Sequence, residues 1–243
     1  MSDWQRNFLP ALRKLISGHN PYEIPGFYSP PWLLFILLPL AWFPWWVAMF
    51  APGIALAVAA YYRRKWWLIP IVGLSFPFIA LSAYANVDWV PLLGLALGGG
   101  IGPLLISTKP QAAGFALLAY LSRGKLLGFV PLLIAVIVSF ILYPHWIGSM
   151  LGGSDIIHTE RNLSLFPYSA PLGIIALVLT WTRRDVLWGA VASLCLTPYY
   201  YVPSLVPLLF LLADRKWWLG VLFSLSTWFL VWASLTGRIG VRF

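Results

Sequence analysis

The chain has 243 residues, of which 60% are hydrophobic and 9% are charged, and its mean hydropathy is +0.82. Its 16 Lys and Arg and 7 Asp and Glu side chains are too few to cover a soluble domain, so the composition predicts an integral membrane protein. The net charge of +9 comes from short basic clusters between apolar runs, a pattern that argues against a nucleic-acid-binding protein.

The first 44 residues form a polar, proline-rich arm that precedes the first long apolar run. Within this arm, GHNPYEIPGFYSPPW at residues 18–32 contains no apolar run. Residues 29–43 are apolar over only about a dozen positions, fewer than a perpendicular span needs, and they include Pro39. We therefore expect an exoplasmic arm that ends in a short helix lying in the outer interface of the membrane.

Four basic clusters determine the predicted topology, because short loops rich in Lys and Arg stay in the cytoplasm. The clusters lie at residues 63–65, 123–125, 183–184 and 215–216. Residues 45–62 are therefore expected to descend into the cytoplasm and residues 66–83 to return. This order places residues 84–89 outside.

Residues 90–122 are too long for one helix and contain two breaks. The first is GGGIGP at residues 98–103, and the second is KPQ at residues 109–111. Backbone that is not helical is tolerated at membrane depth only where protein or a water-filled cavity satisfies it. We therefore expect a broken crossing with a re-entrant or interfacial helix, and we expect the breaks to mark the wall of a cavity.

The remaining segments complete an all-α, GT-C-like polytopic protein with about eight membrane crossings. Residues 126–143 ascend, residues 168–182 descend, residues 186–197 and 202–213 form a short hairpin, and residues 217–236 ascend. We expect one multi-pass domain over residues 1–243, located in a bacterial inner or plasma membrane. Its parts are the exoplasmic arm (1–44), a first helix group (45–143), an exoplasmic loop (144–167) and a second helix group (168–243).

Several short motifs carry a resemblance to a known family. They are NPYE, FYSPPW and LPLAWFP in the arm, NVDWVPLLGLAL at residues 86–97 and STKPQAAGFALL at residues 107–118. Their order resembles the mannosyltransferase-like branch of the GT-C glycosyltransferase superfamily, over roughly residues 3–120. The resemblance implies an inverting hexosyltransferase that moves a sugar from a polyprenyl-phosphate carrier to an exoplasmic acceptor, with a loop carboxylate as base. The implied partners are membrane lipid and the donor lipid, without a cofactor.

The resemblance maps Asp3 onto the catalytic carboxylate of the family. In the family a transmembrane helix precedes this carboxylate, and no such helix precedes Asp3 in this sequence. Either the natural start lies upstream, or another membrane subunit supplies the helix, or the protein is a reduced member that has lost catalysis. A catalytically silent subunit or scaffold of a larger complex is therefore the alternative function. Near the first residue of the sequence, Asp3 is also expected to be held by few contacts.

Two carboxylates are candidates for the catalytic base, which must reach the acceptor hydroxyl from the exoplasmic side. Asp3 is the first, through the family pattern. Asp88 is the second, because it lies beside the glycine-bearing helix of the resemblance. Asp88 also stands just before the helix that we expect to begin near Trp89, so an N-cap is the competing interpretation.

Seven residues are candidates for binding the substrate. Arg161 and Lys109 offer cations for a lipid phosphate, and a guanidinium binds phosphate in a bidentate manner. Lys109 stands in an apolar stretch, where a lysine is either functional or snorkels to the inner interface. The full set is Tyr28, Asn86, Lys109, Gln111, His158, Arg161 and Tyr200.

Two further alternatives stay open. Residues 199–201 are three tyrosines that either line a sugar or prenyl cavity or belong to the aromatic belt of the membrane. In the loop before residue 162, Asp155 and His158 stand about one helical turn apart, a spacing that a divalent metal can use. Two or three ligands without fixed geometry make a weak site, so no metal is predicted.

Overall fold

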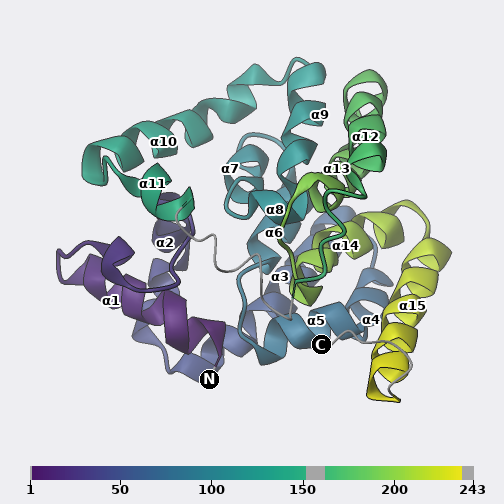
Figure 1. Cartoon of the computed structure of the whole chain (residues 1–243), viewed down its shortest axis with the longest axis horizontal. Helices are drawn as coiled ribbons and strands as arrows, with labels where there is room; N and C mark the ends of the chain where they lie inside the picture. Colours follow the sequence, from purple (N-terminus) through teal and green to yellow (C-terminus); the bar gives the residue numbers. More distant parts are fainter. Residues whose placement is uncertain (1, 152–161, 237–243) are drawn as a thin grey trace.

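The computed structural model describes residues 2–151 and 162–236, and every regular element in these ranges is a helix (Figure 1). The predicted all-α class is confirmed. Two helices are long and apolar enough to cross a membrane, Trp45–Arg63 and Trp217–Leu235. Four shorter helices are also apolar: Pro31–Trp42, Leu126–Leu142, Ala170–Arg183 and Val186–Leu196.

The N-terminal arm folds into short helical segments that pack against the rest of the chain. They are η1 (Trp4–Phe8), α1 (Leu9–Ile16), η2 (Pro21–Glu23), α2 (Pro31–Leu37) and η3 (Leu38–Trp42). Trp4, Phe8 and Leu12 recur at the spacing of one helix face and are buried. They form a hydrophobic cluster with α2 and with the residues just before α6, including Val87. The proline-rich stretch is the turn that leads from α1 back to α2.

The first long apolar helical segment is η4 (Trp45–Met49) followed by α3 (Ala51–Arg63). The predicted single return helix over residues 66–83 is wrong, because the chain forms α4 (Leu68–Gly73) and α5 (Phe76–Ala83). The Ser75 hydroxyl donates to the Val72 carbonyl at 2.6 Å and accepts the Phe78 N–H at 3.3 Å, which ends one helix and caps the next. The Trp228 indole donates to the Leu74 carbonyl at 3.0 Å, so this carbonyl at the break between the two helices has a hydrogen-bond partner.

Residues 89–122 form a hairpin followed by three further short helical segments. The hairpin consists of α6 (Trp89–Leu97) and α7 (Gly102–Ile106), and the chain continues with α8 (Pro110–Ala113), η5 (Gly114–Ala116) and α9 (Leu117–Ser122). The hairpin is tight because Gly94 has no side chain: a Cβ atom there would stand 2.9 Å from the carbonyl oxygen of Gly102. The predicted break at GGGIGP is the turn of this hairpin. It returns Lys109 to the end where α6 begins.

The next segment is an apolar helix that projects from the body of the protein (Figure 1). It consists of η6 (Leu126–Phe129) and α10 (Val130–Leu142), and α11 (Trp146–Leu151) follows it. Large side chains such as Leu133, Ile137 and Ile141 are exposed along α10, as expected where a helix contacts lipid. At the start of α11, the Trp146 ring lies 5.3 Å from the Trp32 ring, which joins this segment to the arm.

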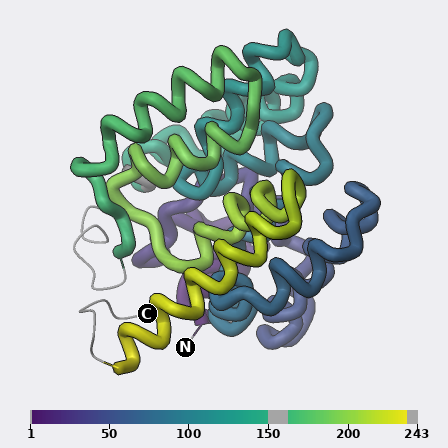
Figure 2. The backbone as a smooth tube through the Cα atoms, turned by 90° about the vertical axis from the view of Figure 1, so that its right-hand side faces the viewer, coloured from purple at the N-terminus to yellow at the C-terminus, as the bar shows by residue number. Residues whose placement is uncertain are grey.

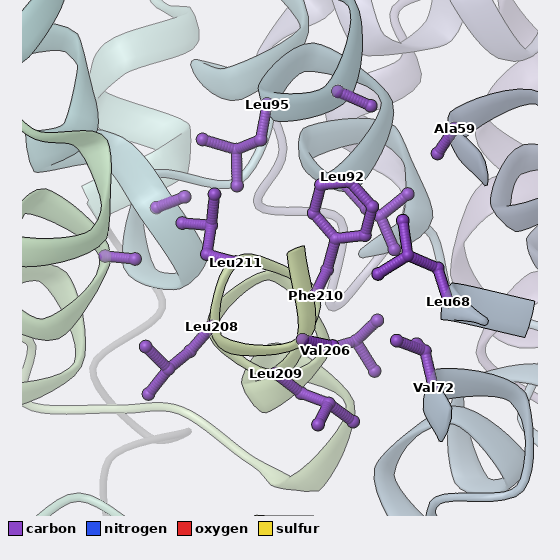
Figure 3. Packing of buried hydrophobic residues seen from close by; sticks show 14 of the residues in the cluster. Ala59, Leu68, Val72, Leu92, Leu95, Val206, Leu208, Leu209, Phe210 and Leu211 are labelled. Carbon is purple, nitrogen blue, oxygen red and sulfur yellow. The ribbon is translucent and has the colours of Figure 1, made fainter. Parts of the chain in front are cut away.

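The last helices surround a buried one. They are α12 (Ala170–Arg183), α13 (Val186–Leu196), η8 (Val202–Leu205), α14 (Val206–Arg215) and α15 (Trp217–Leu235). Helix α14 is apolar from Val206 to Ala213, as a core helix must be, and Figure 3 shows Phe210 pointing toward Leu92 of α6 and Leu68 of α4. Helix α15 instead crosses the outside of the molecule (Figure 2), and only 17% of its apolar span is buried.

The four basic clusters meet at one end of the helices, which we call the basic end. The contacts that join them are Lys65 Nζ to Asp214 Oδ1 at 2.9 Å, an ion pair between Arg215 and Asp185, and Arg123 Nε to the Arg184 carbonyl oxygen at 2.9 Å. Helix α6 also ends here, where Arg63 donates to the Leu95 carbonyl at 2.5 Å. The turns after α3, α9, α12 and α14 therefore lie on one side, as the positive-inside interpretation requires.

Candidate functional site

A cavity of about 740 Å³ lies at the end of α6 that is remote from the basic end. This volume is in the range of small-molecule binding sites. Its wall comes from the N-terminal arm, from the residues around α8 and η5, and from the loop between α13 and α14. Residues from these three parts are Asp3, Phe8 and Tyr28, then Lys109, Gln111 and Phe115, and then Thr197, Tyr199 and Tyr201.

Asp3 is held by three hydrogen bonds. Its backbone N–H donates to the Tyr84 carbonyl at 3.0 Å. Its Oδ2 accepts from Asn86 Nδ2 at 2.7 Å and from the Tyr201 hydroxyl at 2.8 Å. The expectation of few contacts is wrong, because the buried Trp4 side chain anchors the turn that follows Asp3. That turn is the π-helical segment η1, a conformation that is frequent at functional sites.

Asn86 connects the two candidate carboxylates and is only 1% exposed. Its Oδ1 accepts the backbone N–H of Asp88 at 3.0 Å. Because that N–H can only donate, the amide nitrogen of Asn86 must face the other way, where it donates to Asp3 and to Tyr201. The side-chain amide of Asn86 therefore holds both aspartates: its Nδ2 binds the Asp3 carboxylate, and its Oδ1 binds the backbone of Asp88.

Asp88 lies behind the cavity wall, and its side chain is 0% exposed. Its Oδ2 accepts from the Ser204 hydroxyl at 3.0 Å, whereas its Oδ1 has no hydrogen-bond partner and stands 3.8 Å from Lys109 Nζ. The N-cap interpretation is wrong for its side chain, which makes no capping hydrogen bond to α6. Burial raises the pKa of Asp88 above its ordinary value, against the opposing effects of the Lys109 ammonium and the Ser204 hydrogen bond.

Lys109 lies in the wall of the cavity, where its side chain is 12% exposed. Its Nζ stands 3.8 Å from Asp88 and 5.7 Å from the centre of the Phe8 ring, a favourable position for a cation. Snorkelling toward the basic end is therefore the wrong interpretation. The α6–α7 hairpin turns the chain back and points this lysine into the site.

The other predicted binding residues are only partly brought together. Tyr28 and Gln111 line the cavity, whereas Tyr200 packs against the main core. The backbone at Tyr201 is extended, so alternate side chains face opposite sides, and Tyr199 and Tyr201 face the cavity. His158 and Arg161 lie outside the described residues.

Sequence reasoning offered Tyr201 as a possible cavity-lining residue but not as a partner of Asp3, and it missed Ser204 altogether. Tyr201 binds Asp3 from 198 positions away in the chain, and Ser204 binds Asp88 from 116 positions away. Two sequence signals were available. In an extended segment alternate side chains face the same side, which groups Tyr201 with Tyr199, and Ser204 is the one hydroxyl in the apolar run VPSLVP.

The site offers a carboxylate and an ammonium to one cavity. Asp3 can accept a proton, and Lys109 can bind an anion. Among the described residues, no group of three or more His, Cys, Asp or Glu side chains is arranged to hold a metal ion.

Fold and site together define an all-helical protein with two helices able to span a membrane and a carboxylate-bearing cavity at one end. No protein-family model, curated protein or solved structure matches the chain. The resemblance to GT-C transferases therefore stays a prediction.

The buried Asp88 carboxyl predicts a pH-dependent stability. The pKa of this carboxyl is about 3.9 in an unfolded chain, and burial raises it in the folded protein. Above about pH 4, the folded protein therefore binds this proton more tightly than the unfolded chain does. The free energy of unfolding is expected to fall as the pH rises from about 4 toward neutrality, by at most about 1.4 kcal/mol per pH unit from this group. Thermal unfolding in detergent over this range measures the fall.

Two variants check the origin of that pH dependence. Asp88→Asn is expected to lose this part of the fall, because the amide does not ionise. Glu23→Gln is the control, since Glu23 is an exposed partner of Lys14, at 2.7 Å. An undiminished fall in Asp88→Asn would contradict the assignment to Asp88.

Proposed function

We propose that the protein is a multi-pass membrane glycosyltransferase of the GT-C type, which transfers a sugar from a polyprenyl-phosphate carrier to an exoplasmic acceptor. One observation carries this proposal: the Asp3 carboxylate faces a cavity of about 740 Å³ and is fixed there by Asn86 and Tyr201. Catalytic groups need such positioning, and a carboxylate without a role in the cavity would not require it.

The arrangement suits an inverting displacement. The acceptor oxygen forms a bond to the anomeric carbon while the bond from that carbon to the phosphate oxygen breaks, and Asp3 takes the proton of the acceptor hydroxyl. Both side-chain hydrogen bonds of Asp3 go to Oδ2, which leaves Oδ1 for the acceptor. The departing polyprenyl phosphate is an anion, and the Lys109 ammonium in the same wall offers it a counter-charge. Asp88 holds that ammonium in place.

The proposed orientation places the basic end in the cytoplasm and the cavity toward the exoplasmic side. The meeting of all four basic clusters at one end supports this orientation. The exposed apolar surfaces of α10, α12 and α15 support a multi-pass location, because water would not tolerate apolar surfaces of this extent.

Asp3→Asn is expected to lower sugar transfer at least about 100-fold, because the amide cannot accept the proton of the acceptor. The assay uses the purified protein in lipid nanodiscs, with polyprenyl-phosphate-linked mannose and glucose as donors. Glu23→Gln is the matched control: it neutralises an exposed carboxylate of the same arm and is expected to leave transfer unchanged.

The outcomes separate the enzyme from the alternative. Unchanged transfer by a folded Asp3→Asn protein would remove Asp3 as the base. Absence of transfer by the parent with every donor would overturn the proposal and favour a catalytically silent subunit, including one completed by a helix from another membrane protein.

A further inference from the structure

A corner of the basic end, between α9 and α12, gathers four cations. Arg123 and Lys125 follow α9, and Arg183 and Arg184 end α12. The two helices lie side by side (Figure 1), and Arg123 Nε donates to the Arg184 carbonyl at 2.9 Å. The two turns therefore touch, and we call the four residues the α9–α12 corner.

The carboxylate nearest to the corner in sequence is Asp185, which follows Arg184 but pairs with Arg215 instead. Elsewhere at this end, Arg63 and Lys65 pair with Asp214, and Arg215 pairs with Asp185. In the part of the chain that the structure describes, none of the four corner cations forms an ion pair, and all four are exposed. Like charges on two turns that contact each other repel one another, so the corner attracts an anion.

The Arg123 side chain is preorganised for such an anion. Its Nε is tied to the Arg184 carbonyl, and its guanidinium carbon lies 6.0 Å from the centre of the Tyr120 ring. Among the described residues, its two terminal nitrogens form no hydrogen bond. Terminal guanidinium nitrogens bind a phosphate group in a bidentate manner.

Exposed apolar side chains stand next to the four cations. Leu127, two residues after Lys125, is 85% exposed, and Trp181, two residues before Arg183, is 55% exposed. A soluble anion gains nothing from these neighbours. A phospholipid places its phosphate on the cations and its acyl chains on the apolar side chains, which removes both surfaces from water.

We propose that the α9–α12 corner binds the headgroup of an anionic phospholipid in the leaflet at the basic end. The site is separate from the Asp3 cavity and does not depend on sugar transfer. Each cation near an anionic membrane surface strengthens attachment about fivefold, so four acting on one headgroup region distinguish anionic from zwitterionic lipid.

Native mass spectrometry of the purified protein in detergent tests the proposal, with phosphatidylglycerol, phosphatidylcholine and inorganic phosphate as three separate additions. The parent is expected to retain phosphatidylglycerol at least about tenfold better than phosphatidylcholine, and phosphate is expected not to displace it. The variant R123Q/K125Q/R183Q/R184Q is expected to lose this preference. The control R64Q/K216Q removes two exposed cations of the same end, outside the corner, and is expected to keep it.

Three results would overturn the proposal. The first is equal retention of the two phospholipids by the parent, and the second is an unchanged preference in the corner variant. The third is displacement of phosphatidylglycerol by inorganic phosphate, which would identify a site for soluble anions. The first and third use only the parent protein, so they decide the matter even where the fourfold variant does not fold.

Discussion

Asp88→Ala is expected to lower the free energy of unfolding by about 3 kcal/mol, because it removes one partner of a buried ion pair. The Lys109 ammonium, in a side chain only 12% exposed, would lose its counter-charge at 3.8 Å. The Ser204 hydroxyl, which is buried, would lose the acceptor that it binds at 3.0 Å. Denaturant or thermal unfolding in detergent measures the loss.

A double-mutant cycle separates the ion pair from a general effect of truncation. Asp88→Ala combined with Lys109→Met is expected to recover part of the loss, because the ammonium that lacked a partner is also gone. Glu23→Ala is the control on the same side of the molecule, where the exposed pair with Lys14 contributes less than about 1 kcal/mol. Additive losses for Asp88 and Lys109 would contradict a direct interaction between them.

Most helix boundaries could be predicted, because apolar runs and basic turns are local features of the sequence. The predicted descent over residues 168–182 corresponds to Ala170–Arg183, and the predicted last helix over residues 217–236 corresponds to Trp217–Leu235. The break between α4 and α5 was missed because the segment was treated as one apolar run, although Gly73, Ser75 and Pro77 are local signals of a helix end and a helix start. The partner that satisfies the broken backbone, Trp228, comes from α15, 154 positions away.

The residues of the site were easier to predict than their arrangement. Asp3 and Asp88 were proposed through the family resemblance, and Lys109 was proposed as a cation in an apolar stretch. Their contacts depend on tertiary packing: Asp88 has the sequence context of an N-cap, and only the approach of Ser204 and Lys109 makes it a buried partner instead. The local sequence shows which polar side chains are present, and tertiary packing determines which of them contact one another.

A second large loss of stability is expected from a substitution at Gly189 of α13, which packs against η5. A Cβ atom at this position would stand 2.4 Å from Ala116 Cα and 2.5 Å from Ala116 N. These are backbone atoms of η5, so no side-chain rotation relieves the overlap. Close approach of helices at small residues is a common source of stability in membrane proteins. Gly189→Ala is therefore expected to separate α13 from η5 and to lower the free energy of unfolding by about 3 kcal/mol.

The same displacement is expected to reach the site. One turn beyond Gly189, the Ser193 hydroxyl accepts the Phe115 N–H at 2.9 Å, and Phe115 lines the cavity. The matched control is Gly53→Ala in α3, where no atom lies within 4 Å and alanine is the better helix former. The thermal midpoint in detergent is expected to fall for Gly189→Ala and to stay level or rise for Gly53→Ala. Equal midpoints for the two variants would show that α13 and η5 tolerate a methyl group between them, and the cavity wall would then not depend on this contact.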